Sequence, residues 1–179
     1  MAVPTLWSPN HKLVDVGFSF KASSVCLPIQ SVDISVTSDE PANPPGDNYF
    51  SPDARFIRNG VGDVTGLRLR RERLGNGNGR VYLIKVTAVD TAGQRRTACC
   101  AVVVPHDQSA GSVAAVNAAA DSAEADCQAT GATLLNHVLG PPPGWSRAHS
   151  RAEAVGVQRL PPLAAGTPHP PSVKRQFLE

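Results

Sequence analysis

The chain has 179 residues and a net charge of +2; 18% of its residues are charged and only 5% are aromatic. This length holds one domain of about 100 residues with additional segments, or one larger domain. The near-neutral charge argues against a strongly basic nucleic-acid-binding protein, and no apolar run reaches the roughly 20 residues that a membrane-spanning helix needs.

Two strands are predicted within the first 40 residues, one from about Leu13 to Ala22 and one after Pro28. Both predictions depend on apolar residues at every second position, which is the period of a half-buried strand. The alternating residues are Val14, Val16, Phe18 and Phe20 in the first strand, and Val32, Ile34 and Val36 in the second.

The segment from Ser38 to Asp53, SDEPANPPGDNYFSPD, is predicted to be a stiff surface loop because turn-forming residues dominate it. Its acidic residues carry the oxygen ligands that Ca²⁺ prefers, which gives a calcium-binding hypothesis. Their spacing is not that of an EF-hand, so the alternative is a solvated acidic loop. The candidate ligands are Asp39, Glu40, Asp47 and Asp53.

Two further strands are predicted at Ala54 to Asn59, with Phe56 facing inward, and at Gly66 to Arg73. The following LGNGNG at 74–79 is predicted to be a hairpin loop, since a phosphate-binding loop would follow a strand and open a helix. Four arginines, Arg68, Arg70, Arg71 and Arg73, can focus positive potential on an anionic polymer. A solvated strand face is the favoured alternative for them.

Residues 80–106, RVYLIKVTAVDTAGQRRTACCAVVVPH, contain the clearest pattern, two strands joined by a tight turn. If Asp90 faces Gln94, the loop is Thr91 to Gly93, with glycine at the position that needs a positive φ. That register places the apolar residues of both strands on one face, and a slip by one residue would turn one row outward. The expected pairs are Ala88 with Arg96, Val86 with Ala98, Ile84 with Cys100, and Tyr82 with Val102.

After His106 the alanine-rich segment is predicted to form a helix from Ser112, acting as N-cap, to about Leu139, interrupted at Gly131. Its thin apolar face is chiefly Val113, Val116 and Ala120. We expect this helix to cover the apolar end of the outer hairpin face formed by Leu83 and Val103; the alternative is a solvated stalk. Residues 140–179, rich in proline, are predicted to be disordered.

Four cysteines lie at no metal-ligand spacing: Cys26, Cys99, Cys100 and Cys127. Alternation directs Cys100 into the core and Cys99 away from it. A bridge from Cys26 to Cys99 or Cys100 and buried free thiols are both compatible with the sequence.

His11 and His106 fit no catalytic motif. Trp7, just before the first predicted strand, offers a ring on which a sugar ligand can stack. Polar packing is favoured for the histidines, and a core position that closes the sandwich for the tryptophan.

Four segments in order resemble the immunoglobulin-like or PKD-like β-sandwich repeats of bacterial secreted and cell-surface multidomain proteins. They are LWSPNHKLV at 6–14, SVTSDEP at 35–41, LRLRRERLGNGNGRVYLIKVTAVDTAG at 67–93 and VVVPHDQ at 102–108. Ser8 stands where such repeats usually carry a second proline, and the helix and tail have no counterpart in them. The resemblance implies an extracellular spacer or adhesion module without catalytic activity.

We therefore expect an all-β, immunoglobulin-like antiparallel sandwich of six to seven strands at residues 1–108, an alanine-rich helical segment at 109–139 and a disordered tail at 140–179. The expected function is that of a structural or adhesive module, with a calcium-dependent binding module as the alternative. Its partners would be other domains of a parent protein, or a cell-surface protein or polysaccharide. The start of the chain lacks the basic and apolar regions of a signal peptide, so either the protein stays inside the cell or it is exported as part of a longer chain, and the resemblance favours export.

Overall fold

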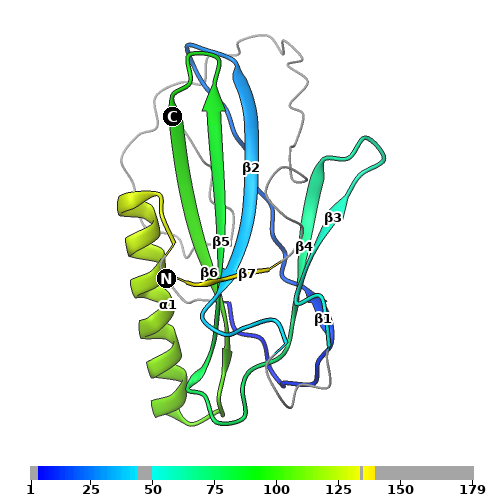
Figure 1. Cartoon of the computed structure of the whole chain (residues 1–179), viewed down its shortest axis with the longest axis vertical. Helices are drawn as coiled ribbons and strands as arrows, with labels where there is room; N and C mark the ends of the chain where they lie inside the picture. Colours follow the sequence, from blue (N-terminus) through cyan, green and yellow to red (C-terminus); the bar gives the residue numbers. More distant parts are fainter. Residues whose placement is uncertain (1–3, 44–49, 134, 140–179) are drawn as a thin grey trace, which may run out of the picture.

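A computed structural model describes residues 4–43, 50–133 and 135–139, so the tail predicted at 140–179 lies outside the described residues. The described part contains seven strands and one helix (Figure 1). Their bounds are β1 Leu13–Asp15, β2 Ile29–Ser38, β3 Ala54–Arg58, β4 Val64–Arg70, β5 Gly79–Asp90, β6 Arg95–Pro105, α1 Ala110–Thr130 and β7 His137–Leu139.

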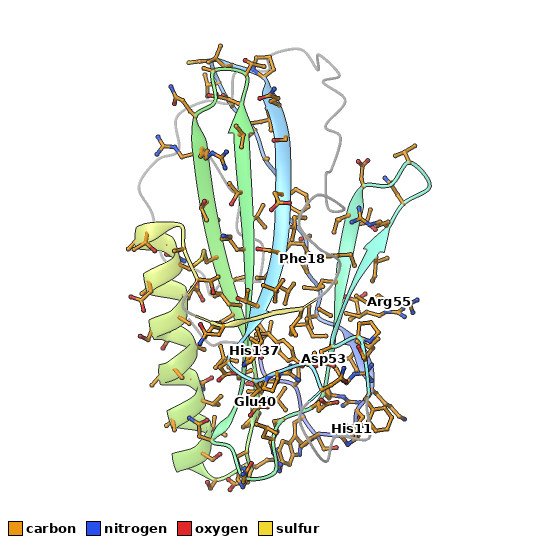
Figure 2. All side chains as sticks on the ribbon, in the orientation of Figure 1. His11, Phe18, Glu40, Asp53, Arg55 and His137 are labelled. Carbon is orange, nitrogen blue, oxygen red and sulfur yellow. A yellow bond between two sulfur atoms is a disulfide. The ribbon has the colours of Figure 1, made fainter. Side chains whose placement is uncertain are left out.

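The strands form two antiparallel sheets, one in the order β1-β4-β3 and the other in the order β6-β5-β2-β7. The inward side chains of both sheets share one apolar core, and Figure 2 shows Phe18 between the sheets. The core includes Val36, Leu67, Leu69 and Ile84, all at most 1% exposed. The predicted all-β sandwich is therefore confirmed at this coarse level.

The register predicted for the hairpin of β5 and β6 is confirmed at all four expected pairs. The Asp90 amide donates to the Gln94 carbonyl at 3.1 Å, and Gly93 has a φ of 80°. The Asp90 carboxylate also accepts from the amides of Ala92 and Gln94, both at 2.9 Å. The turn is thus closed by its own side chain as well as by glycine.

The first strand is shorter than predicted, because β1 ends at Asp15 rather than continuing to Ala22. Gly17 has a φ of 66°, and its amide donates to the Asp15 carboxylate at 2.9 Å, which turns the chain out of the strand. Phe18 is nevertheless buried, so the alternation identified core residues without identifying the length of the strand.

The LGNGNG segment at 74–79 does not form the predicted hairpin loop. It follows β4, which pairs with β1 and β3, and leads into β5, which belongs to the other sheet. The segment therefore crosses from one sheet to the other. Gly79 has a φ of 106°, and a Cβ there would lie 2.9 Å from the Val104 carbonyl oxygen, so a side chain would clash with β6.

The helix α1 begins at Ala110, with its N-cap three residues earlier than predicted, and covers the outer face of β5 and β6 (Figure 1). Its N-cap is Ser109, not Ser112; the Ser109 hydroxyl accepts from the Ser112 amide at 3.2 Å. Leu83 and Val103 lie beneath it in a second apolar cluster with Val116 and Ala120. The expected cover is confirmed, and the solvated stalk is wrong.

A disulfide between Cys99 of β6 and Cys127 of α1 joins the helix to the sheet. Neither of the two bridges to Cys26 that the sequence allowed is therefore formed, and Cys26 is an exposed free thiol rather than a buried one. The predicted directions are confirmed, since Cys99 lies under α1 and Cys100 packs against the core between the sheets, half-buried and outside any disulfide.

The helix α1 ends at Thr130, with Gly131 as its C-cap at a φ of 69°. The interruption predicted at Gly131 is therefore confirmed, and the predicted continuation of the helix to Leu139 is wrong. The Gly131 amide donates to the Cys127 carbonyl at 2.8 Å, a left-handed helix end. The chain then crosses to the far edge of the larger sheet, where β7 pairs with Val36 to Ser38 of β2.

Candidate functional site

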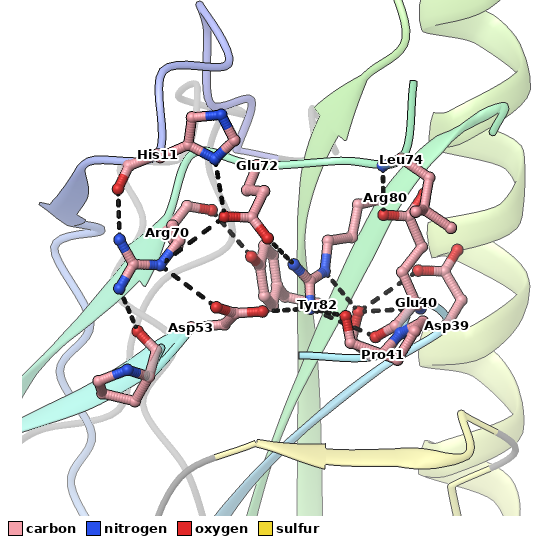
Figure 3. Close-up of polar contacts among 12 residues, drawn as sticks. His11, Asp39, Glu40, Pro41, Asp53, Arg70, Glu72, Leu74, Arg80 and Tyr82 are labelled. Carbon is pink, nitrogen blue, oxygen red and sulfur yellow. Dashed lines mark hydrogen bonds and ion pairs between the residues drawn. The ribbon is translucent and has the colours of Figure 1, made fainter. Parts of the chain in front are cut away.

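Charged side chains gather where the segment before β1, the loop before β3 and the start of β5 meet (Figures 2 and 3). We call this set the ionic cluster. Its members are His11, Asp53, Arg70, Glu72 and Arg80. Four of them are buried, which is unusual for charged residues unless they are paired.

Asp53 lies between two guanidinium groups. Its Oδ2 is 2.7 Å from Nη2 of Arg80, and its Oδ1 is 3.2 Å from Nε of Arg70. Asp53 and Arg80 are each only 1% exposed, so this pair has little screening by water. Both oxygens of Asp53 are thus committed to arginines.

Glu72 connects the same two arginines to a histidine. Its Oε1 is 3.6 Å from Nη1 of Arg80, and its Oε2 is 3.9 Å from Nε of Arg70. Nδ1 of His11 lies 3.0 Å from Glu72 Oε2, and the His11 ring stacks on Phe50 with centroids 4.5 Å apart. The polar packing predicted for His11 is confirmed.

The arginines of the cluster also donate to backbone carbonyls of separate segments. Arg70 donates to the carbonyls of His11 and Pro52, and Arg80 to those of Glu40 and Pro41. The hydroxyl of Tyr82, wholly buried in the core, donates to the Arg70 carbonyl at 2.8 Å. The ionic cluster therefore fixes the positions of loops that are distant in sequence.

Glu40 lies beside the cluster and is 6% exposed. Its Oε2 accepts from the Leu74 amide at 2.8 Å, while Oε1 has no hydrogen-bond partner among the described atoms. Burial raises the pKa of Glu40 to about 7, against the lowering effects of the Leu74 amide and Arg80. Burial also raises the pKa of Asp39, although its Oδ1 accepts from the Val81 amide.

The structure does not bring the calcium candidates together as an open ligand set. Asp53 is paired with arginines, and Asp39 and Glu40 each accept a backbone amide. In the part of the chain that the structure describes, no group of three or more His, Cys, Asp or Glu side chains is placed to hold a metal. Asp47 lies outside the described residues, so the calcium hypothesis stays a prediction.

The arginines of 68–73 do not form one solvated face. Arg68 is exposed, but Arg70 is buried in the ionic cluster. Arg71 donates to the Trp7 carbonyl at 2.8 Å, and Arg73 donates to the His106 carbonyl. Their positive potential is therefore divided among separate contacts rather than focused on one surface.

Trp7 is 37% exposed, so it is not the buried core residue that the sequence predicted. Its neighbour Leu6 packs against the core instead. The Leu6 amide donates to the Val103 carbonyl at 2.8 Å, which fixes this segment along β6.

An open groove of about 440 Å³ adjoins the cluster, between the edge strand β3 and the edge strand β7. We call it the edge groove. Asp53 forms part of its wall, which places the groove directly beside the buried ion pairs. Its other lining residues are Ala42, Ser51, Pro52, Ala54, Arg55, Phe56, Arg58, Val138 and Leu139.

Arg80 was not predicted to be a buried residue, although the alternation along β5 indicates it. Arg80 has the same parity as Tyr82, Ile84 and Val86, the row that faces the core. An arginine in an inward row needs a buried carboxylate, and Asp53 and Glu72 are those partners. The sequence does not indicate which carboxylates pair with Arg80, because the crossover between the sheets decides which acids lie beside it.

Comparison of the chain with protein-family models, with curated proteins and with solved structures finds no match. Within residues 4–43, 50–133 and 135–139, no helix is both long and apolar enough to cross a membrane.

Proposed function

We propose that this chain is a structural or adhesive module of immunoglobulin-like type, without catalytic activity, from an extracellular or cell-surface protein. The order of the strands in the two sheets is the observation that carries this proposal. In the immunoglobulin constant-type sandwich, strands B, E and D are neighbours in one sheet and C, F and G in the other. The sheet β1-β4-β3 corresponds to the first set, and β2, β5 and β6 of the sheet β6-β5-β2-β7 correspond to the second, with β7 as an additional edge strand beside β2.

Tyr82 supports the same assignment. In immunoglobulin-like domains a tyrosine near the start of strand F donates back to the chain near the corner between strands E and F. Tyr82 lies near the start of β5, and its hydroxyl donates to the carbonyl of Arg70, the last residue of β4. The disulfide differs from that of antibody domains, since it joins β6 to α1 rather than two strands across the core.

The buried Cys99–Cys127 disulfide supports export, because disulfides persist in oxidising compartments and are rare in reducing ones. The ionic cluster supports a structural role. Its carboxylates are occupied by guanidinium groups that also hold loop carbonyls, an arrangement suited to fixing loops rather than to binding a substrate.

The proposal is tested by finding the protein in the cells that make it. A tagged copy at its natural locus is fractionated, and free thiols are alkylated before lysis. We expect the chain in the surface or extracellular fraction, with Cys99 and Cys127 protected from alkylation. A chain found in the cytoplasm with all four thiols alkylated would contradict the proposal.

A further inference from the structure

An asparagine that is followed by glycine can lose its side-chain amide spontaneously. The glycine nitrogen, unhindered because this residue has no Cβ, attacks the side-chain carbonyl carbon of the asparagine, and water opens the cyclic imide that forms. The chain contains three such pairs: Asn59–Gly60, Asn76–Gly77 and Asn78–Gly79. Because the dipeptide is the same in all three, the fold decides which of them reacts fastest.

The pair at 59–60 is held by hydrogen bonds at the tip of the hairpin of β3 and β4. Oδ1 of Asn59 accepts from the Val61 amide at 3.1 Å and from the Asp63 amide at 2.8 Å, and Nδ2 of Asn59 donates to Asp63 Oδ2 at 3.1 Å. Ring closure changes the side-chain torsions of Asn59, and such a rotation breaks these hydrogen bonds. This pair should therefore react slowly in the folded chain.

The pair at 78–79 is held through its glycine. Gly79 is buried as the first residue of β5, where it pairs with Pro105. A Cβ on Gly79 would lie 2.9 Å from the Val104 carbonyl oxygen and 3.1 Å from the His106 amide nitrogen, so the backbone at this position is closely packed. Turning the nitrogen of Gly79 toward the Asn78 side chain would displace the start of β5.

Asn76 has neither restraint. Its side chain is exposed and has no hydrogen-bond partner among the residues that the structure describes. The nitrogen of Gly77 donates to the Leu74 carbonyl at 3.2 Å, in a turn that lies outside the strands. Ring closure at Asn76 therefore breaks one hydrogen bond, compared with three at Asn59.

From this comparison we propose that Asn76 is a site of spontaneous covalent modification, at which the folded chain converts asparagine to aspartate and isoaspartate. The nitrogen of Gly77 loses its proton and bonds to Cγ of Asn76, and the bond from Cγ to Nδ2 breaks, so that ammonia leaves. Water then adds to one carbonyl of the imide. Opening at Cγ gives aspartate, and opening at the main-chain carbonyl gives isoaspartate; neither step involves oxidation or reduction.

The modification acts on the crossover between the two sheets. Gly77 lies against Glu40, because a Cβ on Gly77 would be 2.8 Å from Glu40 Oε1, and Oε2 of Glu40 accepts from the Leu74 amide at 2.8 Å. Isoaspartate lengthens the main chain by one carbon between residues 76 and 77, which shifts Gly77 relative to Glu40. We therefore expect isoaspartate to weaken the contact between Glu40 and the crossover.

This inference goes beyond the proposed function. The reaction needs only the fold and water, so it is independent of the cellular location of the chain and of any partner.

The test incubates the full chain at pH 8 and follows deamidation over time by tryptic digestion and mass spectrometry. Cleavage after arginine gives the peptides 59–68 and 74–80, which separate the hairpin tip from the crossover. Fragmentation of the second peptide distinguishes Asn76 from Asn78. A parallel incubation in concentrated urea gives the rates in the unfolded chain, where the three pairs have lost their different surroundings.

We expect Asn76 to react at least about tenfold faster than Asn59 and Asn78 in the folded chain, a factor that one or two additional hydrogen bonds can supply. In urea the three rates should be similar. The variant Asn76→Gln should nearly abolish modification of the peptide 74–80, because glutamine closes a six-membered ring much more slowly. The matched control Asn78→Gln should leave the rate at Asn76 unchanged.

The variant Asp63→Ala tests the protection of Asn59. It removes the acceptor of Asn59 Nδ2, so it should raise the rate at Asn59 and leave the rate at Asn76 unchanged. Hydrogen exchange gives a further readout, since the isoaspartate form, separated by ion-exchange chromatography, should exchange faster than the unmodified form in 74–80 but not in 59–68.

Three results would overturn the proposal: equal rates at Asn76 and Asn59 in the folded chain, the same excess of Asn76 in urea as in the folded chain, or no modification of Asn76 unless the chain is unfolded.

Discussion

At the scale of single residues, Arg80 shows how this fold holds a charge inside its sandwich. The guanidinium is 1% exposed and lies over the Tyr82 ring, with 4.6 Å between its Cζ and the ring centroid. It contacts Asp53 and Glu72, and it donates to the Ser38 hydroxyl at 2.9 Å. Removing it would leave two buried acids short of one positive charge.

We therefore expect Arg80→Met to lower the free energy of unfolding by about 3–5 kcal/mol, because a buried carboxylate loses its counter-charge. Urea denaturation measures the change. The control Arg55→Met removes an exposed arginine and should change the free energy of unfolding by less than about 0.5 kcal/mol. A loss below about 1 kcal/mol for Arg80→Met would mean that water reaches the cluster.

Glu40 makes the free energy of unfolding depend on pH. Its pKa is about 7 in the folded chain and near 4.5 in the unfolded chain, so the folded state binds the proton more tightly. The contribution of Glu40 to stability is full below pH 4.5, falls as the pH rises toward 7, and stays low above it. With screening by solvent, the fall is on the order of 1–2 kcal/mol.

We expect Glu40→Gln, which resembles the protonated form, to flatten this part of the stability profile. Urea denaturation at pH 5 and pH 8 measures the free energy of unfolding of both proteins. The variant should exceed wild type in this free energy by more at pH 8 than at pH 5. The control Asp121→Asn removes the same charge from an exposed position on α1. Equal slopes for Glu40→Gln and wild type would show that another group carries the dependence.

At the scale of elements, α1 is held by few large side chains, so its disulfide carries much of its attachment. The buried residues of the helix are Val116, Ala120, Ala123 and Cys127, three of them small. A disulfide between residues that are 28 positions apart restricts the conformations of the unfolded chain. For a loop of this length, the restriction raises the free energy of unfolding by about 3–4 kcal/mol.

We expect the double variant Cys99→Ala and Cys127→Ala to lose about 3–4 kcal/mol in urea denaturation. The control Cys26→Ala removes an exposed free thiol and should leave stability unchanged within about 0.5 kcal/mol. If the two variants unfold at the same urea concentration, the bridge contributes nothing to stability.

Sequence reasoning was most successful where a pattern stays within one element or one turn. The β5–β6 register followed from alternation and one glycine turn. The sequence indicates the disulfide less clearly. Helical spacing places Cys127 on the same face of the helix as Val116, Ala120 and Ala123, and this face packs on the side of β6 that carries Cys99. No sequence pattern predicts the sheet crossover at 74–79 or the pairing of β7 with β2, because both depend on packing between distant segments.

At the scale of the whole molecule, the larger sheet is shared by two apolar clusters, one on each face. The cluster toward the smaller sheet contains large residues such as Tyr82, Leu67 and Ile34. The cluster under α1 is smaller and rich in alanine. The free energy that apolar contacts contribute scales with the apolar area that they bury. The contacts under α1 therefore oppose local opening less strongly than the contacts between the two sheets.

This difference predicts the order in which the layers open. Without the disulfide, α1 should open locally while the sandwich stays folded, so its amides exchange faster than those of β2 and β5 under native conditions. Hydrogen exchange with mass spectrometry on the double variant Cys99→Ala and Cys127→Ala measures this, with Cys26→Ala as the control. In the control, α1 should exchange at rates closer to those of the strands, because Cys127 remains bonded to Cys99. Equal exchange of α1 and β5 in the double variant would show instead that helix and sandwich unfold as one cooperative unit, with the alanine-rich contact sufficient to hold them together.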